Sequence, residues 1–219
     1  MNLYKRGSRG EIVKQIQKAL AGAGLGVFPD GIYGQLTEEA VKAYQSRNGL
    51  KPDGIVGPAT MAKLIPCRFK KSKRIIKEII IHCTATPEGR NYTVEQCRAD
   101  HKKQGWSDIG YHYLVYRDGK IMQGRDVDIV GAHCAAGGHN TYSIGIAYVG
   151  GLENKPGVPY DRLKSKDTRT LQQKAALLNL LIDLRKLYPY AEIYGHRDFE
   201  PRKDCPSFDA RTEYRNIRP

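Results

Sequence analysis

The stretch Ile75-Ile76-Lys77-Glu78-Ile79-Ile80-Ile81-His82 decides the fold of the larger part of the chain. Five of these eight residues are isoleucine, a β-branched residue that favours strands, and the run is apolar enough for both of its faces to be buried. It therefore predicts a central strand that ends at His82. Because a rigid sheet can aim the side chain at a strand end, His82 is a candidate functional residue.

The sequence that follows predicts an α/β domain with a mixed β-sheet flanked by helices. Thr93-Val94-Glu95-Gln96 is a capping box that opens a helix to about Gln104. Arg117-Asp118-Gly119 is typical of a hairpin bend between two short strands. Two more strands and a largely buried helix are expected at 143–149, 191–194 and 171–187.

An internal repeat marks the first part of the chain. Asp30-Gly31-Ile32-Tyr33-Gly34 with Thr37 returns 23 residues later as Asp53-Gly54-Ile55-Val56-Gly57 with Thr60, so both copies read D-G-I-x-G-x-x-T. Asp-Gly favours a tight turn, and we expect each threonine hydroxyl to cap a following helix. With helices expected at 9–22, 38–47 and 58–64, residues 1–65 are predicted to form a small three-helix domain.

A basic linker is expected at residues 66–73, before an α/β domain at 74–219. Of the net charge of +13, six units lie between residues 66 and 77, which contain no acidic residue. A cationic segment attracts polyanions, which include nucleic acid, acidic membrane surfaces and anionic cell envelopes. No aromatic or recognition-helix pattern accompanies the charge, so a nucleic-acid partner is not expected.

Composition excludes several other classes of protein. Hydrophobic residues make up 40% and charged residues 27% of the chain, which fits a globular protein rather than a disordered or fibrous one. The longest apolar stretch, 175–182, is too short to cross a bilayer, so membrane insertion is not expected. The first residues lack the apolar core of a secretion signal, which favours synthesis in the cytoplasm without general export. Five cysteines, an odd number, do not suggest a disulfide framework.

Three residues at or after predicted strands form a candidate metal set, namely His82, His196 and Cys205. Two imidazoles and a thiolate suit Zn²⁺, and three protein ligands leave a fourth position open for water, as in catalytic zinc sites. Spacing alone leaves a structural role for each histidine open, because His82 is more than a hundred residues away from the other two.

Residues 75–215 resemble the type 2, zinc-dependent N-acetylmuramoyl-L-alanine amidases, most closely the bacteriophage lysozyme-like members. The resemblance is carried in order by 81–86, 104–113, 118–119 with 124–125, 131–133, 140 with 143–146, and 203–209. The first part of the chain resembles the small helical peptidoglycan-binding domain, whose hallmark is the repeated turn. The residues of that hallmark, expected to belong to a wall-binding domain, are Asp30, Gly31, Tyr33, Gly34, Asp53, Gly54 and Gly57.

The resemblance implies a role for each candidate site residue. It implies that zinc binds to His82, His196 and Cys205, and that Tyr111 contacts the metal-bound water or the reacting amide. It also implies that Lys203 faces the developing oxyanion and that His133 is a histidine of the substrate cleft. Zinc polarises a carbonyl, and an ammonium stabilises charge that appears only in the transition state.

One position departs from many members of this family. They carry a glutamate as general base after Ser-Ile-Gly-Ile, whereas this chain has Ala147. Proton transfer is therefore left open between Tyr111, Lys203 and solvent. The phage-type members also lack this glutamate.

The resemblance implies a peptidoglycan hydrolase that cleaves the amide between N-acetylmuramic acid and L-alanine. An endolysin that reaches the bacterial cell wall after release, working as a monomer, is expected, with an exported autolysin as the other possibility. A non-catalytic peptidoglycan-recognition protein is a second hypothesis, which the presence of Cys205 disfavours. A cysteine hydrolase using Cys83 or Cys134 is a third, although Cys83 is expected to point away from the metal.

Overall fold

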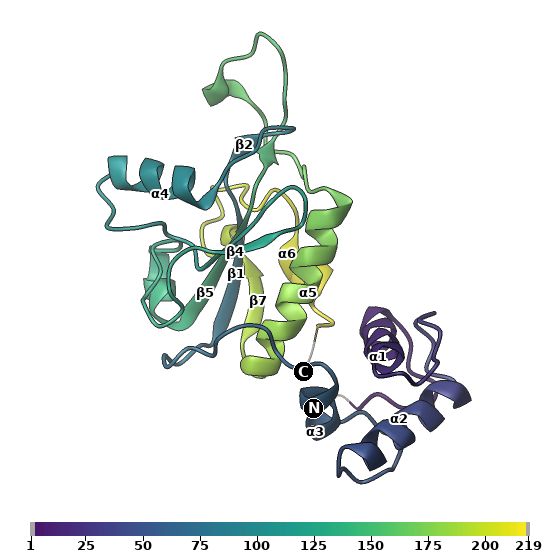
Figure 1. Cartoon of the computed structure of the whole chain (residues 1–219). Coiled ribbons are helices and arrows are strands. Elements are labelled where there is room, and N and C mark those ends of the chain that lie inside the picture. Colours follow the sequence, from purple (N-terminus) through teal and green to yellow (C-terminus); the bar gives the residue numbers. More distant parts are fainter. Residues whose placement is uncertain (1–2, 218–219) are drawn as a thin grey trace. The chain divides into compact units, whose positions relative to one another are not determined.

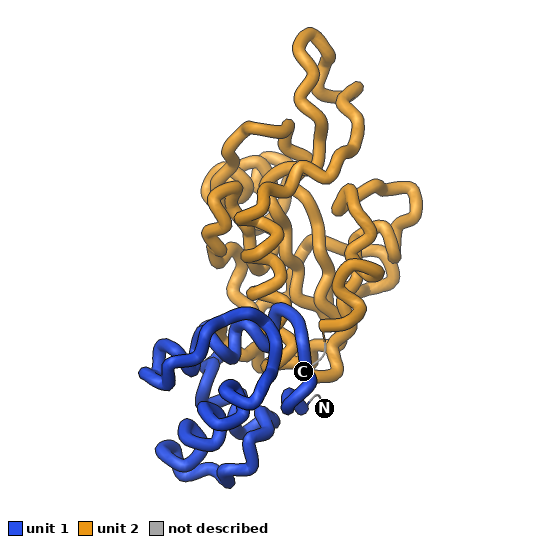
Figure 2. Tube along the Cα trace, turned by 90° about the vertical axis from the view of Figure 1, so that its right-hand side faces the viewer, with its two compact units in different colours: residues 1–68, 218–219 blue, residues 69–217 orange. Residues whose placement is uncertain are grey.

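The structure is a computed structural model that describes residues 3–217 in two compact units (Figure 2). The first unit extends to residue 68 and the second spans residues 69–217. Within the described residues, no helix is both long enough and apolar enough to cross a membrane.

The first unit contains the three helices that the sequence predicts. They are α1 (Glu11–Gly22), α2 (Gln35–Arg47) and α3 (Pro58–Leu64), and α2 begins three residues before its predicted start (Figure 1). Apolar side chains from all three helices and from the two repeat turns form one core. The buried members of this core are Val13, Ile16, Leu20, Val27, Tyr33, Ala40, Val41, Val56 and Leu64.

The two repeat threonines do not cap helices, which corrects the prediction. Gly34 and Gly57 occupy the N-cap positions, and neither can offer a side-chain hydrogen bond. Thr37 lies inside α2 and is buried, and its hydroxyl accepts a hydrogen bond from the Gln17 amide at 3.0 Å. The hydroxyl of Thr37 therefore pairs with a buried side chain rather than with the N–H groups at the helix end.

Gln17 is the residue that holds the first repeat turn in place. Its side chain is 1% exposed and lies on the buried face of α1. The amide donates to Asp30 Oδ1 at 2.8 Å and to the Ile32 carbonyl at 3.0 Å, and its oxygen accepts from the Gly31 N–H at 2.8 Å. Every polar atom of this buried amide is therefore satisfied inside the unit, as buried polar groups require.

Gln45 holds the second repeat turn in the same way. Its amide donates to Asp53 Oδ1 at 3.0 Å, to the Ile55 carbonyl at 2.9 Å and to the Thr60 hydroxyl at 3.1 Å. Its oxygen accepts from the N–H of Gly54, which has φ of 73°, a conformation that favours glycine. The sequence repeat is thus a repeat of one hydrogen-bonded unit, a turn clasped by a glutamine.

The second unit is built on a mixed five-stranded sheet with the order β4-β3-β5-β1-β7. The predicted isoleucine strand is near its centre, and it is parallel to its neighbours β5 and β7. The strands are β1 (Glu78–Cys83), β3 (Tyr113–Val115), β4 (Ile121–Gln123), β5 (Ser143–Tyr148) and β7 (Glu192–Gly195). A separate pair is formed by β2 (Thr86–Pro87) and β6 (Gly151–Leu152). The predicted hairpin is confirmed by the antiparallel pairing of β3 with β4.

Helices flank this sheet on both sides, as expected for the α/β class (Figure 1). Val94 and Cys97 of α4 (Val94–Lys103) pack on Leu114 and Ala147 of the sheet. The long helix α5 (Leu171–Leu187) covers the other side, and a short helix α6 (Ala210–Tyr214) follows β7. Three short 3₁₀ segments complete the unit at Ala136–Tyr142, Tyr160–Arg162 and His196–Asp198.

The start of β1 and part of the expected linker differ from the predictions. Ile75 is 69% exposed and precedes the strand, which begins at Glu78. Ser72, expected in the linker, is buried and hydrogen-bonded: its N–H donates to the Tyr188 hydroxyl and its own hydroxyl donates to the Val127 carbonyl. Lys70 also forms an ion pair with Asp128 at 2.7 Å. These contacts attach residues 70–74 to the second unit.

Candidate active site

The pairing of β1 with β7 brings His82 and His196 together. Ile81 is in register with Gly195, so the residue that follows each of them, a histidine in both cases, lies at the same edge of the parallel sheet. The two ring centroids are 4.6 Å apart. Two residues separated by 114 positions in the sequence thus become neighbours through strand register alone.

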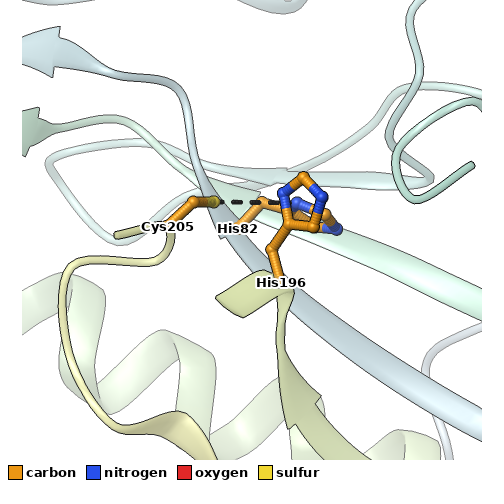
Figure 3. Close-up of side chains that lie close together, drawn as sticks. All are labelled: His82, His196 and Cys205. Carbon is orange, nitrogen blue, oxygen red and sulfur yellow. Dashed lines mark hydrogen bonds between the residues drawn. The ribbon is translucent and has the colours of Figure 1, made fainter. Parts of the chain in front are cut away.

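Cys205 reaches the same place through the turn that follows His196. A hydrogen bond of 2.8 Å from the Arg197 N–H to the Cys205 carbonyl closes this turn. The Cys205 sulfur lies 3.7 Å from His82 Nδ1 and accepts a hydrogen bond from the Cys83 N–H at 3.3 Å. One ligand atom from each of His82, His196 and Cys205 lies within 4.8 Å of the other two, and the three side chains point toward one another (Figure 3).

Both histidines are engaged by other side chains through one ring nitrogen. His82 Nε2 lies 3.0 Å from His133 Nδ1, and His196 Nε2 lies 2.9 Å from a carboxylate oxygen of Glu200. The remaining nitrogen of each ring is therefore free of these partners. Burial lowers the pKa of His82 well below its usual range and also lowers the pKa of His196, so both rings are neutral near pH 7. Neutral imidazole is the form that binds metal ions.

The donor set fits a metal of intermediate softness. It contains two imidazole nitrogens and one cysteine sulfur, which is a ligand combination of catalytic zinc sites. The Glu200 carboxylate on the outer nitrogen of His196 is also typical of metal-binding histidines, because such a contact fixes the tautomer and the ring orientation. The three predicted residues thus form a possible His/Cys metal site.

A pocket of about 430 Å³ adjoins this group of residues. Its lining is Trp106, Ser107, Arg125, Ala132, His133, Ala135, Asn140, Glu200 and Lys203. Tyr111, the other predicted catalytic residue, packs against His82 with ring centroids 5.3 Å apart. The structure therefore gathers the predicted residues Tyr111, His133 and Lys203 around the two histidines.

His133 lies behind His82 as well as beside the pocket. It is 7% exposed, and its second nitrogen, Nε2, lies 3.2 Å from the Ser143 hydroxyl. A Cβ atom at Gly145 would overlap the His133 ring, so glycine in the Ser-Ile-Gly-Ile stretch makes room for this histidine. His133 therefore contacts His82 in addition to lining the pocket.

Ala147 follows Ser-Ile-Gly-Ile, where many members of the resembled family carry a glutamate. It is paired in register with His82 on the neighbouring strand, and its methyl group is fully buried. The carboxylate in the site comes instead from Glu200, which the sequence pattern did not single out. The spacing of four between His196 and Glu200 was the available signal, but residues 196–206 looked like an irregular turn rather than a helical one.

Three other residues lie around the site. His112 has a structural role, because its Nδ1 accepts from the Gly145 N–H at 2.9 Å. His101 is half-buried and packs on Trp106 and Tyr111. Cys83, expected to point away from the metal, has its thiol 3.7 Å from the Ser207 hydroxyl, and its N–H donates to the Cys205 sulfur at 3.3 Å.

The repeat residues of the first unit have positions that shape its fold. The Asp30 and Asp53 carboxylates accept hydrogen bonds from their own turns at Ile32 and Ile55. Tyr33 is 1% exposed, and its hydroxyl donates to the Gly54 carbonyl at 2.9 Å, which links the two copies of the repeat.

Comparison with known proteins identifies the family of the second unit. Residues 72–208 match the family model described as N-acetylmuramoyl-L-alanine amidase, which covers more than half of the chain. The chain belongs to this amidase family. Residues 9–64 match a model described as a peptidoglycan binding domain, so both predicted resemblances are confirmed.

Relatives of the amidase include phage endolysins. The endolysin of Enterobacteria phage K11 is 42% identical over 132 residues, which are 60% of this chain and 81% of the relative. Among solved structures, the endolysin amidase LysCS from Clostridium intestinale URNW is 28% identical with a TM-score of 0.51, covering 64% of this chain and 80% of that one. The Ph2119 endolysin of a Thermus scotoductus MAT2119 bacteriophage is 26% identical with a TM-score of 0.51, covering 71% and 94%. The protein is a peptidoglycan amidase that resembles endolysins.

Proposed function

We propose that this amidase is zinc-dependent and that His82, His196 and Cys205 hold the metal. The proposal is carried by one observation, the convergence of two neutral imidazoles and a thiol within 4.8 Å beside a pocket. A zinc ion bound there would polarise the scissile carbonyl and lower the pKa of a water molecule. The presence of Cys205 in the group supports an enzyme rather than a protein that only recognises peptidoglycan.

Three further residues around the metal ligands act on the substrate. Tyr111 packs against His82, where its hydroxyl can hydrogen-bond to the reacting amide. Burial raises the pKa of Tyr111 well above its usual value, so it acts as a neutral phenol. Lys203 lines the pocket, where its ammonium stabilises the negative charge that develops on the carbonyl oxygen in the tetrahedral transition state. His133 holds His82 and forms part of the substrate cleft.

We further propose that the first unit, residues 1–65, holds the amidase on the cell wall. The match to a peptidoglycan binding domain supports this role. Attachment raises the local concentration of the amidase unit near its substrate, and the basic residues from 66 onward add attraction to anionic polymers. The likeness to phage endolysins supports action on the wall after release from the cell that made the protein.

Metal analysis of the purified full chain tests the zinc proposal. About one zinc ion per chain is expected in the unaltered protein, and Cys205→Ser is expected to lose it because the thiolate ligand is gone. Cys97→Ser is a matched control, since Cys97 is a buried thiol of the same unit that belongs to neither group of possible metal ligands. Full zinc occupancy in Cys205→Ser would contradict the proposal.

A further inference from the structure

One carboxylate lies between the candidate metal site and the substrate pocket. Glu200 Oε1 is 2.9 Å from His196 Nε2, and its Oε2 is 2.9 Å from Lys203 Nζ. The Glu200 side chain is 28% exposed and lines the pocket together with Lys203. The two oxygens of a single side chain thus join a candidate ligand to a candidate catalytic cation.

The backbone of the turn fixes this arrangement. The Glu200 N–H donates to the His196 carbonyl at 3.1 Å, which is one helical turn, and the Lys203 N–H donates to the Glu200 carbonyl at 2.9 Å. Residues four apart in a helical turn face the same side, so Glu200 is brought next to His196 by local geometry. The contact therefore does not depend on a distant part of the chain.

The contact determines which nitrogen of His196 is available. An ionised carboxylate can only accept hydrogen bonds, so His196 Nε2 must carry the proton that it donates to Glu200. The neutral ring then has its lone pair on Nδ1. A carboxylate behind a ligating histidine fixes its tautomer and orientation and raises its basicity.

The contact with Lys203 has a second effect. A lysine ammonium is carried on a flexible four-carbon stem, and the side chain of Lys203 is 49% exposed. Without a partner, this ammonium would be free to turn toward solvent. The ion pair with Glu200 holds it at the pocket wall, where charge develops during amide hydrolysis.

We propose that Glu200 is the positioning residue of this site, which orients His196 for metal binding through Nδ1 and holds Lys203 at the pocket. The inference rests on the proposed zinc function. It gives the site the carboxylate that Ala147 does not supply, in a supporting role rather than in contact with the reacting atoms.

A second arrangement of the same residues is the main competitor. Cys134, His196 and Glu200 also offer ligand atoms within 4.8 Å of one another, in which case Glu200 would itself bind the metal. The two arrangements differ in their dependence on Cys134. Only the competitor requires the Cys134 sulfur.

The test measures zinc affinity of the full chain by competition with a chelating dye, and kcat and KM on a soluble N-acetylmuramoyl peptide. Glu200→Ala is expected to bind zinc about 10- to 100-fold more weakly. The isosteric Glu200→Gln keeps an oxygen acceptor for His196 and is expected to lose less than about tenfold. Lys203→Met should keep the zinc affinity but lower kcat. Glu88→Ala, which removes a surface carboxylate bonded to Lys166, is the matched control and should change neither quantity.

The outcomes separate this inference from the proposed function. Unchanged zinc affinity in both Glu200 variants would overturn the positioning role, and so would a loss in Cys134→Ser equal to that in Glu200→Ala. Failure of the unaltered protein to bind zinc at all would overturn the proposed function itself. Weaker zinc binding in Glu200→Ala, with Cys134→Ser unchanged, supports the inference.

Discussion

Two groups of buried polar side chains, one in each unit, use their hydrogen-bonding atoms in opposite ways. In the first unit, the Gln17 and Gln45 amides use all of their donors and acceptors within the fold. In the second unit, His82 and His196 each use one ring nitrogen for support and direct the rest of the ring toward Cys205. A buried side chain whose polar atoms are all hydrogen-bonded contributes to stability. A group of side chains whose unused lone pairs point to one place can also bind a ligand.

The largest expected effect comes from removing one of the three candidate metal ligands. Cys205→Ser should reduce amidase activity by about 100-fold or more, because the loss of a metal ligand exceeds the 10- to 100-fold typical of residues behind one. The far-ultraviolet circular dichroism should not change. Activity is measured by release of new amino groups from peptidoglycan, with Cys97→Ser as the control. Comparable losses in the two serine variants would contradict a specific role of Cys205.

Removing the buried glutamine that holds a repeat turn should affect stability and not catalysis. Gln17→Ala leaves the Gly31 N–H and its other partners without a buried hydrogen bond, which costs about 2 kcal/mol. Amide hydrogen exchange in α2 should therefore be about 30-fold faster, since 1.4 kcal/mol is a factor of ten. Activity on a soluble muropeptide should not change. Gln35→Ala, which removes only an exposed side chain bonded to Glu39, is the control, and equal exchange in both variants would contradict the role of Gln17.

Removing the first unit tests whether it contributes to activity by binding the cell wall. Deletion of residues 1–68 keeps Ser72 and its anchoring contacts in the second unit. Activity on intact sacculi should fall about tenfold more than activity on a soluble muropeptide, because only the polymer offers a surface for attachment. Equal losses on the two substrates would count against a wall-binding role.

The smallest effect concerns a helix cap away from the site. Thr170 caps α5, and its hydroxyl accepts from the Gln173 N–H at 3.0 Å. Thr170→Ala should lower the free energy of unfolding of the second unit by about 1 kcal/mol, measured by urea denaturation. Zinc content should be unaffected. Thr141→Ala, at an exposed threonine, provides the reference, and a shift as large in that variant would show that the cap is not the cause.

Much of the fold follows from local sequence signals. The isoleucine run predicts β1, the Asp-Gly bend predicts the hairpin of β3 and β4, and α5 begins and ends at its predicted residues. The strands β2 and β6 were not foreseen, because two-residue strands have no periodicity to detect. The threonine caps were predicted wrongly because the side chains that bind these hydroxyls come from other helices.

The site could be predicted only in part, for a similar reason. His82, His196 and Cys205 were identifiable as residue types that bind zinc, but their convergence depends on the parallel pairing of β1 with β7. Glu200 and the support of His82 by His133 depend on a turn and on side-chain packing that have no periodic pattern. Gln17 and Gln45 were missed because their spacings to the aspartates, 13 and 8 residues, are unequal.

The most direct test of zinc-dependent amide cleavage is the release of free N-terminal L-alanine from purified peptidoglycan. It is measured with the untreated protein, after treatment with a chelator, and after zinc is added back. We predict that the untreated protein releases L-alanine amino groups, that chelation abolishes the release and that zinc restores it. Release that continues after complete removal of the metal, or release of reducing sugars without new amino groups, would contradict the account.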